Sequence, residues 1–398
     1  MRLKVKNNKK KLKAPKLRFP EFTDDWEKCS LNKFTEYESS NYSISQFNEC
    51  NLSGKYKVFD VNKEIACIDE FDQLNEYISI IKDGAGIGRT EIRPEKSSVI
   101  GTMGYIKSIN SDIYFVYSLI KNVKWNKYKN GSTIPHVYYK DYGNEKFFIP
   151  NKDEQAKIGK FFKEIDRFIT LNQNKISHIK DLKAGLLQKM FPKNGETKPE
   201  IRFDGFTDDW EEFRFGKIYQ IRRGLTYKPS DVQETGIRVL RSSNINEDTF
   251  VLRSDDVFVK SKSVNIDEIK NGDILITSAN GSSRLVGKHA IINGIDNKTV
   301  HGGFMLVAST DNPQFVNALM SSNWYSKFIN IFVSGGNGAI GNLSKSHLEN
   351  QKILIPELSE QQKIGEFFSQ LDNLLTLYKR KVEHLQEQKK SLLKQMFI

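Results

Sequence analysis

The strongest constraint on this chain is an internal repeat. Residues 15–26 carry the pattern Pro-x-x-Arg-Phe-x-x-Phe-Thr-Asp-Asp-Trp, and this opening motif returns at residues 199–210, 184 positions later. A closing motif, Ile-Pro-x3-Glu-Gln-x-Lys-Ile-Gly-x-Phe-Phe-x3-Asp, occupies residues 149–166 and 355–372, at an offset of 206. The segments between the motifs have diverged. The repeat therefore predicts one framework that presents two different surfaces.

Composition excludes several classes of protein. The 398 residues are 38% apolar and 28% charged, which is typical of a globular chain with two or three domains. No apolar run approaches the roughly 18 residues that span a bilayer, and we expect neither a membrane span nor a secretory signal. The three cysteines, Cys29, Cys50 and Cys67, form no close pair. We therefore expect no disulfide framework, and we expect a cytoplasmic location.

The positive charge is concentrated at the N-terminus. Of the net charge of +12, eight positive charges lie before residue 17, which leaves +4 for the rest of the chain. We expect residues 1–16 to form a disordered basic tail, which either contacts phosphates or is only solvated. A body with so little charge would bind nucleic acid through local basic faces, or with a partner that contributes contacts.

Two long helices are predicted, at residues 151–191 and 357–398. Apolar residues there are spaced alternately four and three apart, which indicates a coiled-coil seam of about five heptads in each helix. Lys183 and Lys389 occupy the same seam position, where a polar group sets register and its long stem reaches the edge. The remaining seam residues are Ile158, Phe162, Ile165, Ile169, Asn172, Ile176, Ile179, Leu186 and Met190, and then Ile364, Phe368, Leu371, Leu375, Tyr378, Val382, Leu385, Leu392 and Met396.

The lengths of these helices predict an antiparallel pair. Each helix of about 39 residues would extend about 58 Å, whereas a compact domain of about 150 residues is only about 30 to 40 Å across. A parallel pair would need the chain to return along the whole first helix. We therefore expect antiparallel packing related by an approximate twofold axis, with residues 192–200 as the linker. The alternative interpretation is that each helix packs on its own domain.

The diverged regions, residues 17–150 and 201–356, predict two small α/β (α+β) domains. Short strand-like runs at Tyr77–Ile81, Ser98–Ile100 and Asp273–Thr277 alternate with glycine and asparagine turns.

A weaker sequence similarity between the two repeats lies shortly before each long helix. Ile134-x-His136-Val137 matches Ile340-x-Asn342-Leu343, and each follows a loop rich in small residues. Binding residues concentrate on such loops, although hairpin turns also explain glycine clusters.

No motif in the chain predicts catalysis. Gly84-Ala85-Gly86-Ile87-Gly88 lacks the dinucleotide-binding spacing and continues into an expected strand, which favours a turn. The segment from Gly281 to His289 is one residue too long for a P-loop and has histidine where magnesium binding requires Ser or Thr. The six histidines form no metal-binding pattern, and the Asn/Asp-Pro-Pro-Tyr/Phe motif of adenine methyltransferases is absent. We predict no catalytic residue and no metal site.

The closing motif, followed by a long helix ending Leu-Leu-x-x-Met-Phe, resembles the conserved regions of type I restriction-modification specificity subunits. The Phe-Thr-Asp-Asp-Trp of each opening motif resembles them too. The resemblance covers the chain after the basic tail, which the family pattern does not require. It implies two target-recognition domains, each of which reads one half of an asymmetric bipartite DNA target. The helices would set the gap between the half-sites and dock two modification subunits.

The resemblance also implies that the chain is not itself an enzyme and binds no cofactor. S-adenosylmethionine would be bound by the adenine methyltransferase subunits, and ATP and magnesium by two restriction subunits where these are present. Two other hypotheses remain: a self-contained nuclease or methyltransferase, and a coiled-coil adaptor whose globular ends bind protein.

Candidate DNA-reading residues follow from side-chain chemistry, because Arg suits guanine, Asn suits adenine and Lys positions phosphates. In the first domain they are Arg89, Arg93, Lys107, Lys127, Lys129 and His136, and in the second they are Arg222, Arg223, Arg241, Asn244, Asn280, Arg284, Lys288, Asn337 and Asn342. We further expect Trp26 and Trp210 of the opening motifs to be buried anchors.

Overall fold

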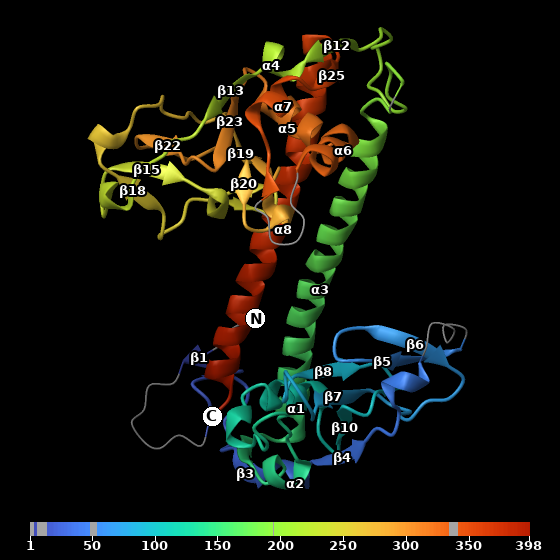
Figure 1. Cartoon of the computed structure of the whole chain (residues 1–398). Helices are drawn as coiled ribbons and strands as arrows, with labels where there is room; N and C mark the ends of the chain where they lie inside the picture. The colour runs from blue at the N-terminus through green and yellow to red at the C-terminus, as the bar shows by residue number, and fades with distance from the viewer. Residues whose placement is uncertain (1–3, 6–13, 48–53, 194, 334–340) are drawn as a thin grey trace. The chain divides into compact units, whose positions relative to one another are not determined.

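The computed structural model describes residues 4–5, 14–47, 54–193, 195–333 and 341–398. The chain forms two compact units (Figure 1). Unit 1 comprises Met1–Asn174 and Lys379–Ile398, and unit 2 comprises Lys175–Tyr378. Each unit therefore contains part of both long helices. Within the described residues, no helix is both long enough and apolar enough to cross a membrane.

The two predicted helices are α3 (Lys152–Lys189) and α8 (Leu358–Met396). Each begins just after the proline of its closing motif, and the Asn151 side chain accepts a hydrogen bond from the Glu154 amide at the start of α3 (3.0 Å). Every residue of the predicted seam is buried or half-buried, as the 3.5-residue period requires of a packed helix face.

Within each unit, the portions of α3 and α8 run antiparallel. In unit 1, the Lys389 ammonium lies 2.5 Å from the Asp166 carboxylate, and Phe397 packs on Phe162. In unit 2, Lys183 lies 2.5 Å from Asp372. Both lysines are predicted seam residues, and both aspartates end a closing motif. The lysines thus reach the edge of the seam and bind a carboxylate of the other helix.

Unit 1 contains a four-stranded antiparallel sheet of order β4-β10-β7-β8 and a three-stranded sheet of order β6-β5-β9, with β3 pairing β11 separately. Its strands are β1 (Lys4–Val5), β2 (Leu17–Arg18), β3 (Glu27–Ser30), β4 (Thr35–Ser39), β5 (Tyr56–Phe59), β6 (Glu64–Ile68), β7 (Tyr77–Ile81), β8 (Thr90–Arg93), β9 (Ser97–Val99), β10 (Met103–Ser108) and β11 (Lys146–Ile149). Its short helices are α1 (Ile113–Ile120) and α2 (Tyr139–Tyr142).

Unit 2 has a matching four-stranded sheet of order β13-β23-β19-β21, a second sheet of order β14-β18-β15-β22 that has one strand more than its counterpart in unit 1, and β12 pairing β25. Its strands are β12 (Glu211–Arg214), β13 (Gln220–Arg223), β14 (Val232–Gln233), β15 (Ile237–Leu240), β16 (Ile245–Asn246), β17 (Thr249–Phe250), β18 (Val257–Val259), β19 (Ile274–Thr277), β20 (Ala279–Asn280), β21 (His289–Ile291), β22 (Thr299–His301), β23 (Met305–Ser309), β24 (Gly341–Asn342) and β25 (Lys352–Ile355). Its short helices are α4 (Phe215–Ile218), α5 (Pro313–Met320), α6 (Asn323–Phe332) and α7 (Lys345–Glu349).

The inner strand β7 of unit 1 shows why this domain has two layers of core. Alternate side chains of a strand point to opposite faces. Ile78 and Ile80 of β7 belong to a core with α1 and α3, whereas Tyr77 and Ile81 belong to a second core with the β6-β5-β9 sheet. The strands predicted at 77–81, 98–100 and 273–277 are confirmed as β7, β9 and β19, within one residue at each end.

The opening and closing motifs bind each other inside each unit. The Arg18 guanidinium donates two hydrogen bonds to the Glu154 carboxylate (both 2.7 Å), and Trp26 donates a third (3.2 Å). In unit 2, Arg202 donates to both oxygens of Glu360 (2.7 and 2.8 Å). Both glutamates are fully buried, so the paired charges lie in a low-dielectric site.

The C-terminal end of each long helix completes an aromatic cluster. Phe397, at the end of α8, packs on Trp26, Phe115 and Phe162 of unit 1. The matching Phe191, after α3, packs on Trp210, Phe315 and Phe368 of unit 2. The predicted burial of both tryptophans is confirmed. The end of each repeat thus closes the core of the other domain.

The predicted disorder of residues 1–16 does not hold for Lys4–Val5, which pairs as β1 with β2. Ala14 is also buried. The unpaired backbone groups of β2 give the N-terminal segment a strand to join. Residues 6–13 lie outside the described residues.

Candidate nucleic-acid interface

Five chain segments of unit 2 meet around the turn that joins β22 to β23. This loop cluster 2 consists of residues 223–227, 240–244, 278–284, 302–304 and 341–343. Backbone amides join the segments through hydrogen bonds from Leu225 to His301, Gly302 to Leu240, Ser278 and Ala279 to Phe304, and Leu343 to Ser278 (2.6–3.1 Å). An added side chain on Gly224 would overlap the Gly302 carbonyl, so glycine is required at this close approach.

Unit 1 builds the same arrangement from unrelated side chains. Its loop cluster 1 consists of residues 40–42, 59–62, 82–89, 100–102 and 130–138. Four corresponding backbone hydrogen bonds run from Ile100 to Phe59, Lys82 and Asp83 to Thr102, and Val137 to Lys82 (2.9–3.3 Å). The fifth bond differs, because Gly101 donates to the Tyr42 carbonyl (2.6 Å), whereas in unit 2 Leu225 donates to the His301 carbonyl. Thr102 therefore takes the place of Phe304, and the weak sequence echo around His136 and Asn342 lies at matching positions.

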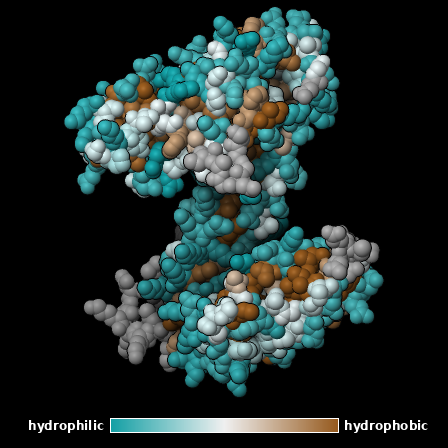
Figure 2. Space-filling view, in the orientation of Figure 1, coloured by the Kyte–Doolittle hydropathy of each residue, from teal (hydrophilic) through white to brown (hydrophobic). Residues whose placement is uncertain are grey.

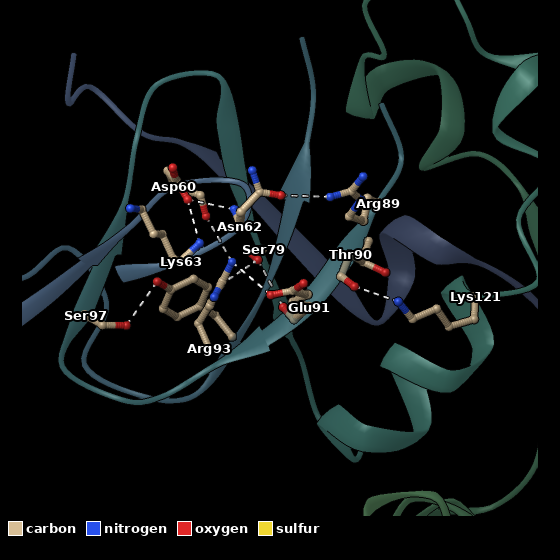
Figure 3. A network of polar contacts seen from close by, with 11 residues as sticks. Asp60, Asn62, Lys63, Ser79, Arg89, Thr90, Glu91, Arg93, Ser97 and Lys121 are labelled. Atoms are coloured by element: carbon tan, nitrogen blue, oxygen red, sulfur yellow. Dashed lines mark hydrogen bonds and ion pairs between the residues drawn. The ribbon is translucent and has the colours of Figure 1, made fainter. Parts of the chain in front are cut away.

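Loop cluster 1 presents Arg89 and His136. Arg89 is exposed and donates to the Asn62 side chain (3.3 Å), which holds the guanidinium beside the cluster (Figure 3). His136 Nδ1 lies 2.7 Å from the Asp83 carboxylate. The predicted turn at 84–88 is confirmed, because all three of its glycines have positive φ, a backbone conformation that L side chains rarely adopt.

Arg93 lies inside unit 1 rather than on its surface. Its guanidinium donates to Ser79 and to the Asp60 carbonyl and pairs with Glu91 at 3.0 Å (Figure 3). It also stacks over the Phe59 ring. A buried side chain with these partners holds the turn after β5 against β7 and β8. It is not available to a base, and we remove it from the proposed DNA-facing set.

The three lysines predicted in the first domain lie outside loop cluster 1. Lys107 on β10 lies 2.5 Å from Glu38, and its ammonium lowers the pKa of that carboxyl. Lys127 pairs with Glu145 at 2.9 Å. Lys129 is exposed and immediately precedes Asn130, at the edge of the cluster. Lysines at such positions suit phosphate contacts better than base contacts.

Loop cluster 2 brings together five predicted side chains that can donate hydrogen bonds. Arg223, Arg241, Arg284 and Asn342 are exposed, and Asn280 is half-buried. The Asn280 amide donates to the Ser242 hydroxyl (3.0 Å), which orients it on β20. Arg and Asn are the residue types that read guanine and adenine in the major groove.

Three other predicted residues of the second domain are not brought to this surface. Arg222 donates to Asp273 (2.7 Å) and to the carbonyls of residues 267 and 268. Asn244 is fully buried and donates to Val251 and Asp256, so we remove it from the proposed set as well. Lys288 is half-buried beside β21, outside the cluster. Asn337 lies outside the described residues.

A buried histidine supports the turn in loop cluster 2. His301, the last residue of β22, is 1% exposed, and its Nε2 lies 3.3 Å from the Arg222 carbonyl. Burial lowers the pKa of His301 to about 4, because the charged imidazolium would lose its hydration. A neutral imidazole is expected there near pH 7, as a structural rather than a titrating group.

Sequence reasoning missed several residues of this framework. Asp166 and Asp372, the partners of the seam lysines, could have been found from their identical places in the closing motifs. Phe304 was missed because a lone aromatic residue after two glycines carries no periodic signal. Asn62 and Asp83 gave no signal either, since their roles depend on segments that are remote in the sequence.

Comparison with known proteins agrees with this architecture. The sequence profile of the type I restriction modification DNA specificity domain matches residues 23–181 and 207–387. The type I restriction enzyme MjaVIII specificity subunit of Methanocaldococcus jannaschii is 24% identical over 411 aligned residues, which cover 95% of this chain and 92% of the relative.

Two solved structures share the fold. The S subunit of a type I restriction-modification system from M. genitalium superposes with a TM-score of 0.68 at 17% identity, covering 97% of this chain and 99% of that chain. A chain from a structure concerned with complex assembly and conformational transition of the type I R-M system has a TM-score of 0.51 at 15% identity and covers 92% of this chain and 96% of that chain. With the profile matched in both repeats, the chain belongs to the family of type I restriction-modification DNA specificity subunits.

Proposed function

We propose that each loop cluster reads one half of an asymmetric, bipartite DNA target. The observation that carries the proposal is that both clusters share four matching backbone hydrogen bonds and differ in the side chains that they present. A common backbone suits a common approach to the duplex, whereas different side chains specify different bases. Exposed arginines in both clusters suit guanine edges and phosphates.

The long helices are proposed to set the gap between the half-sites. In both α3 and α8, the lysine of the interhelical pairs lies 17 positions after the aspartate. Equal spacing lets both ion pairs form in one antiparallel register. A helix of fixed length and register can then hold two DNA-reading elements at a fixed separation along the groove.

The helices also carry a repeated apolar surface that is not part of the seam. Phe168 and Leu171 on α3 are 53% and 45% exposed, and Leu374 and Leu377 on α8, at the offset of 206, are 41% and 60% exposed. Figure 2 shows small apolar areas on the mostly hydrophilic surface of these helices. Apolar residues kept at matching positions of both repeats suit one partner that binds twice. We propose that they dock two copies of the modification subunit.

In this proposal the chain contributes recognition and no chemistry. S-adenosylmethionine would be bound by the modification subunits, which methylate adenine. ATP and magnesium would be bound by restriction subunits in assemblies that contain them.

The test is to express the chain with its modification subunit in a host that lacks DNA methylation and to map every methylated adenine in the genome. One asymmetric motif of two parts with a fixed gap is expected. A stable complex that methylates nothing, or that methylates without sequence preference, would contradict the proposal.

Substitution and domain exchange assign each cluster to its half-site. Arg241→Ala should weaken the base preference at one position of the half-site that loop cluster 2 reads. The control is Arg253→Ala, at an exposed arginine paired with Asp255 on its own loop, which should leave the motif unchanged. Replacing residues 27–149 with the domain of another family member should change only the half-site that loop cluster 1 reads. If Arg241→Ala or the domain exchange changed both half-sites, the assignment of one cluster to each half-site would be contradicted.

A further inference from the structure

Phe304 is the most exposed aromatic side chain among the described residues of loop cluster 2, with 71% of its surface accessible. Single exposed apolar residues are common on protein surfaces, so exposure alone does not mark a contact. The position of this ring within the cluster is the informative observation.

The backbone under Phe304 is held on both sides. Its turn is closed by a hydrogen bond from the Met305 amide to the Gly302 carbonyl (2.8 Å). The Phe304 carbonyl accepts hydrogen bonds from the amides of Ser278 (2.9 Å) and Ala279 (3.1 Å). The turn joins β22 of one sheet to β23 of the other (Figure 1). The ring is therefore presented from a fixed backbone, and little further ordering would accompany binding.

Residues with hydrogen-bonding side chains lie on the segments that adjoin this turn. Asn280 follows Ala279 directly, and Asn342 lies on β24, which pairs with β20. Arg241 follows Leu240, whose carbonyl accepts from the Gly302 amide. These residue types suit guanine and adenine edges. A phenylalanine beside them supplies the one major-groove contact that they cannot make, an apolar contact with the 5-methyl group of thymine.

We propose that Phe304 is a specificity-determining residue that recognises the 5-methyl group of a thymine in the half-site read by unit 2. This inference rests on the proposed function. If adenine is the methylated base, its half-site contains at least one A·T pair and hence at least one thymine methyl group. The matching residue of loop cluster 1 is Thr102, which is also exposed but presents a much smaller apolar surface.

The experiment uses the complex of the full chain with its modification subunits and duplexes that carry the mapped motif. Each thymine of the second half-site is replaced in turn by deoxyuridine, which removes only the methyl group, and Kd is measured. The unsubstituted complex should bind one of these duplexes about fourfold more weakly, the factor that corresponds to burial of one methyl-sized group.

Two variants and one control complete the test. Phe304→Ser should bind the thymine and deoxyuridine duplexes equally, whereas Phe304→Leu should retain the preference. Ile218→Ala removes an exposed apolar side chain of α4, outside the cluster, and should behave as the unsubstituted complex.

The inference is overturned if no deoxyuridine substitution weakens binding, or if Phe304→Ser keeps the preference for thymine. It is also overturned if Phe304→Ser weakens binding to specific and non-specific DNA alike. These outcomes leave the mapped motif intact, so they differ from failure of the proposed function, in which no motif is found at all.

Discussion

The Arg202 guanidinium and the Glu360 carboxylate form a two-bond ion pair in unit 2, and Arg18 and Glu154 form the same pair in unit 1. Loss of one partner leaves the other charge buried without compensation. The pair thus gives a physical reason for an opening motif and a closing motif to remain alike while the loops between them diverge. The loops can therefore diverge without disturbing the ion pair that holds each domain to its long helix.

The cost of breaking this pair can be measured. We expect Glu360→Gln to lower the free energy of unfolding of unit 2 by about 3 kcal/mol, because the Arg202 charge would remain largely buried. Glu366→Gln, an exposed position on the same helix, should change it by less than about 0.5 kcal/mol. Denaturant unfolding followed by tryptophan fluorescence checks both. Equal stability of the two variants would show that the pair is dispensable.

At the scale of elements, the closing-motif glycines allow a short helix to abut a long one. A Cβ added to Gly365 of α8 would lie 2.7 Å from the Phe315 amide nitrogen, and one added to Gly159 of α3 would overlap the Asp112 carboxylate at the start of α1. Real Cβ atoms do not approach this closely. The glycines therefore serve helix packing in both units, although glycine weakens a helix interior.

A matched pair of substitutions tests this packing. Gly365→Ala should destabilise unit 2 by about 2 kcal/mol through overpacking. Gly185→Ala, in α3, adds a Cβ with no atom within 4 Å and should stabilise the chain by about 0.5–1 kcal/mol through helix propensity. Thermal unfolding of the two variants should therefore shift in opposite directions. Shifts of the same sign would contradict the packing role.

What the sequence predicts at this scale depends on whether the signal is local. The long helices and the strands β7, β9 and β19 follow from periodicity and turn residues, which are properties of neighbouring positions. The five segments of a loop cluster are joined by backbone hydrogen bonds between remote segments, and such bonds leave no pattern in a single sequence. Side-chain type alone therefore placed Arg93 and Asn244 among the candidate DNA-reading residues, although tertiary packing buries both.

At the scale of the whole molecule, each unit is built from both repeats. Phe397, in the second repeat, belongs to the core that holds Trp26 and Phe115 of the first repeat. We expect Phe397→Ala to destabilise unit 1 by about 3–5 kcal/mol and to leave unit 2 unaffected. Ile398→Ala, at a half-exposed position, is the control. Limited proteolysis with identification of the fragments should show cleavage within residues 14–150, and cleavage confined to unit 2 would refute this dependence.

The interhelical ion pairs allow a test of whether the helices set the proposed gap between half-sites. Seven residues inserted between Asp166 and Lys183 of α3 alone would place one lysine out of reach of its aspartate, because α8 keeps its spacing of 17 residues. The same insertion between Asp372 and Lys389 of α8 restores equal spacing. A heptad also keeps the seam in phase, since the apolar pattern repeats every seven residues.

We therefore expect methylation to be lost with either single insertion. With both insertions, methylation should return on a motif whose half-sites are unchanged and whose gap is longer by about three base pairs. This value follows from about 10 Å of added helix and about 3.4 Å per base pair. Mapping of methylated adenines in cells that carry each variant measures the gap directly. An unchanged gap in the double-insertion variant would mean that α3 and α8 do not set the separation.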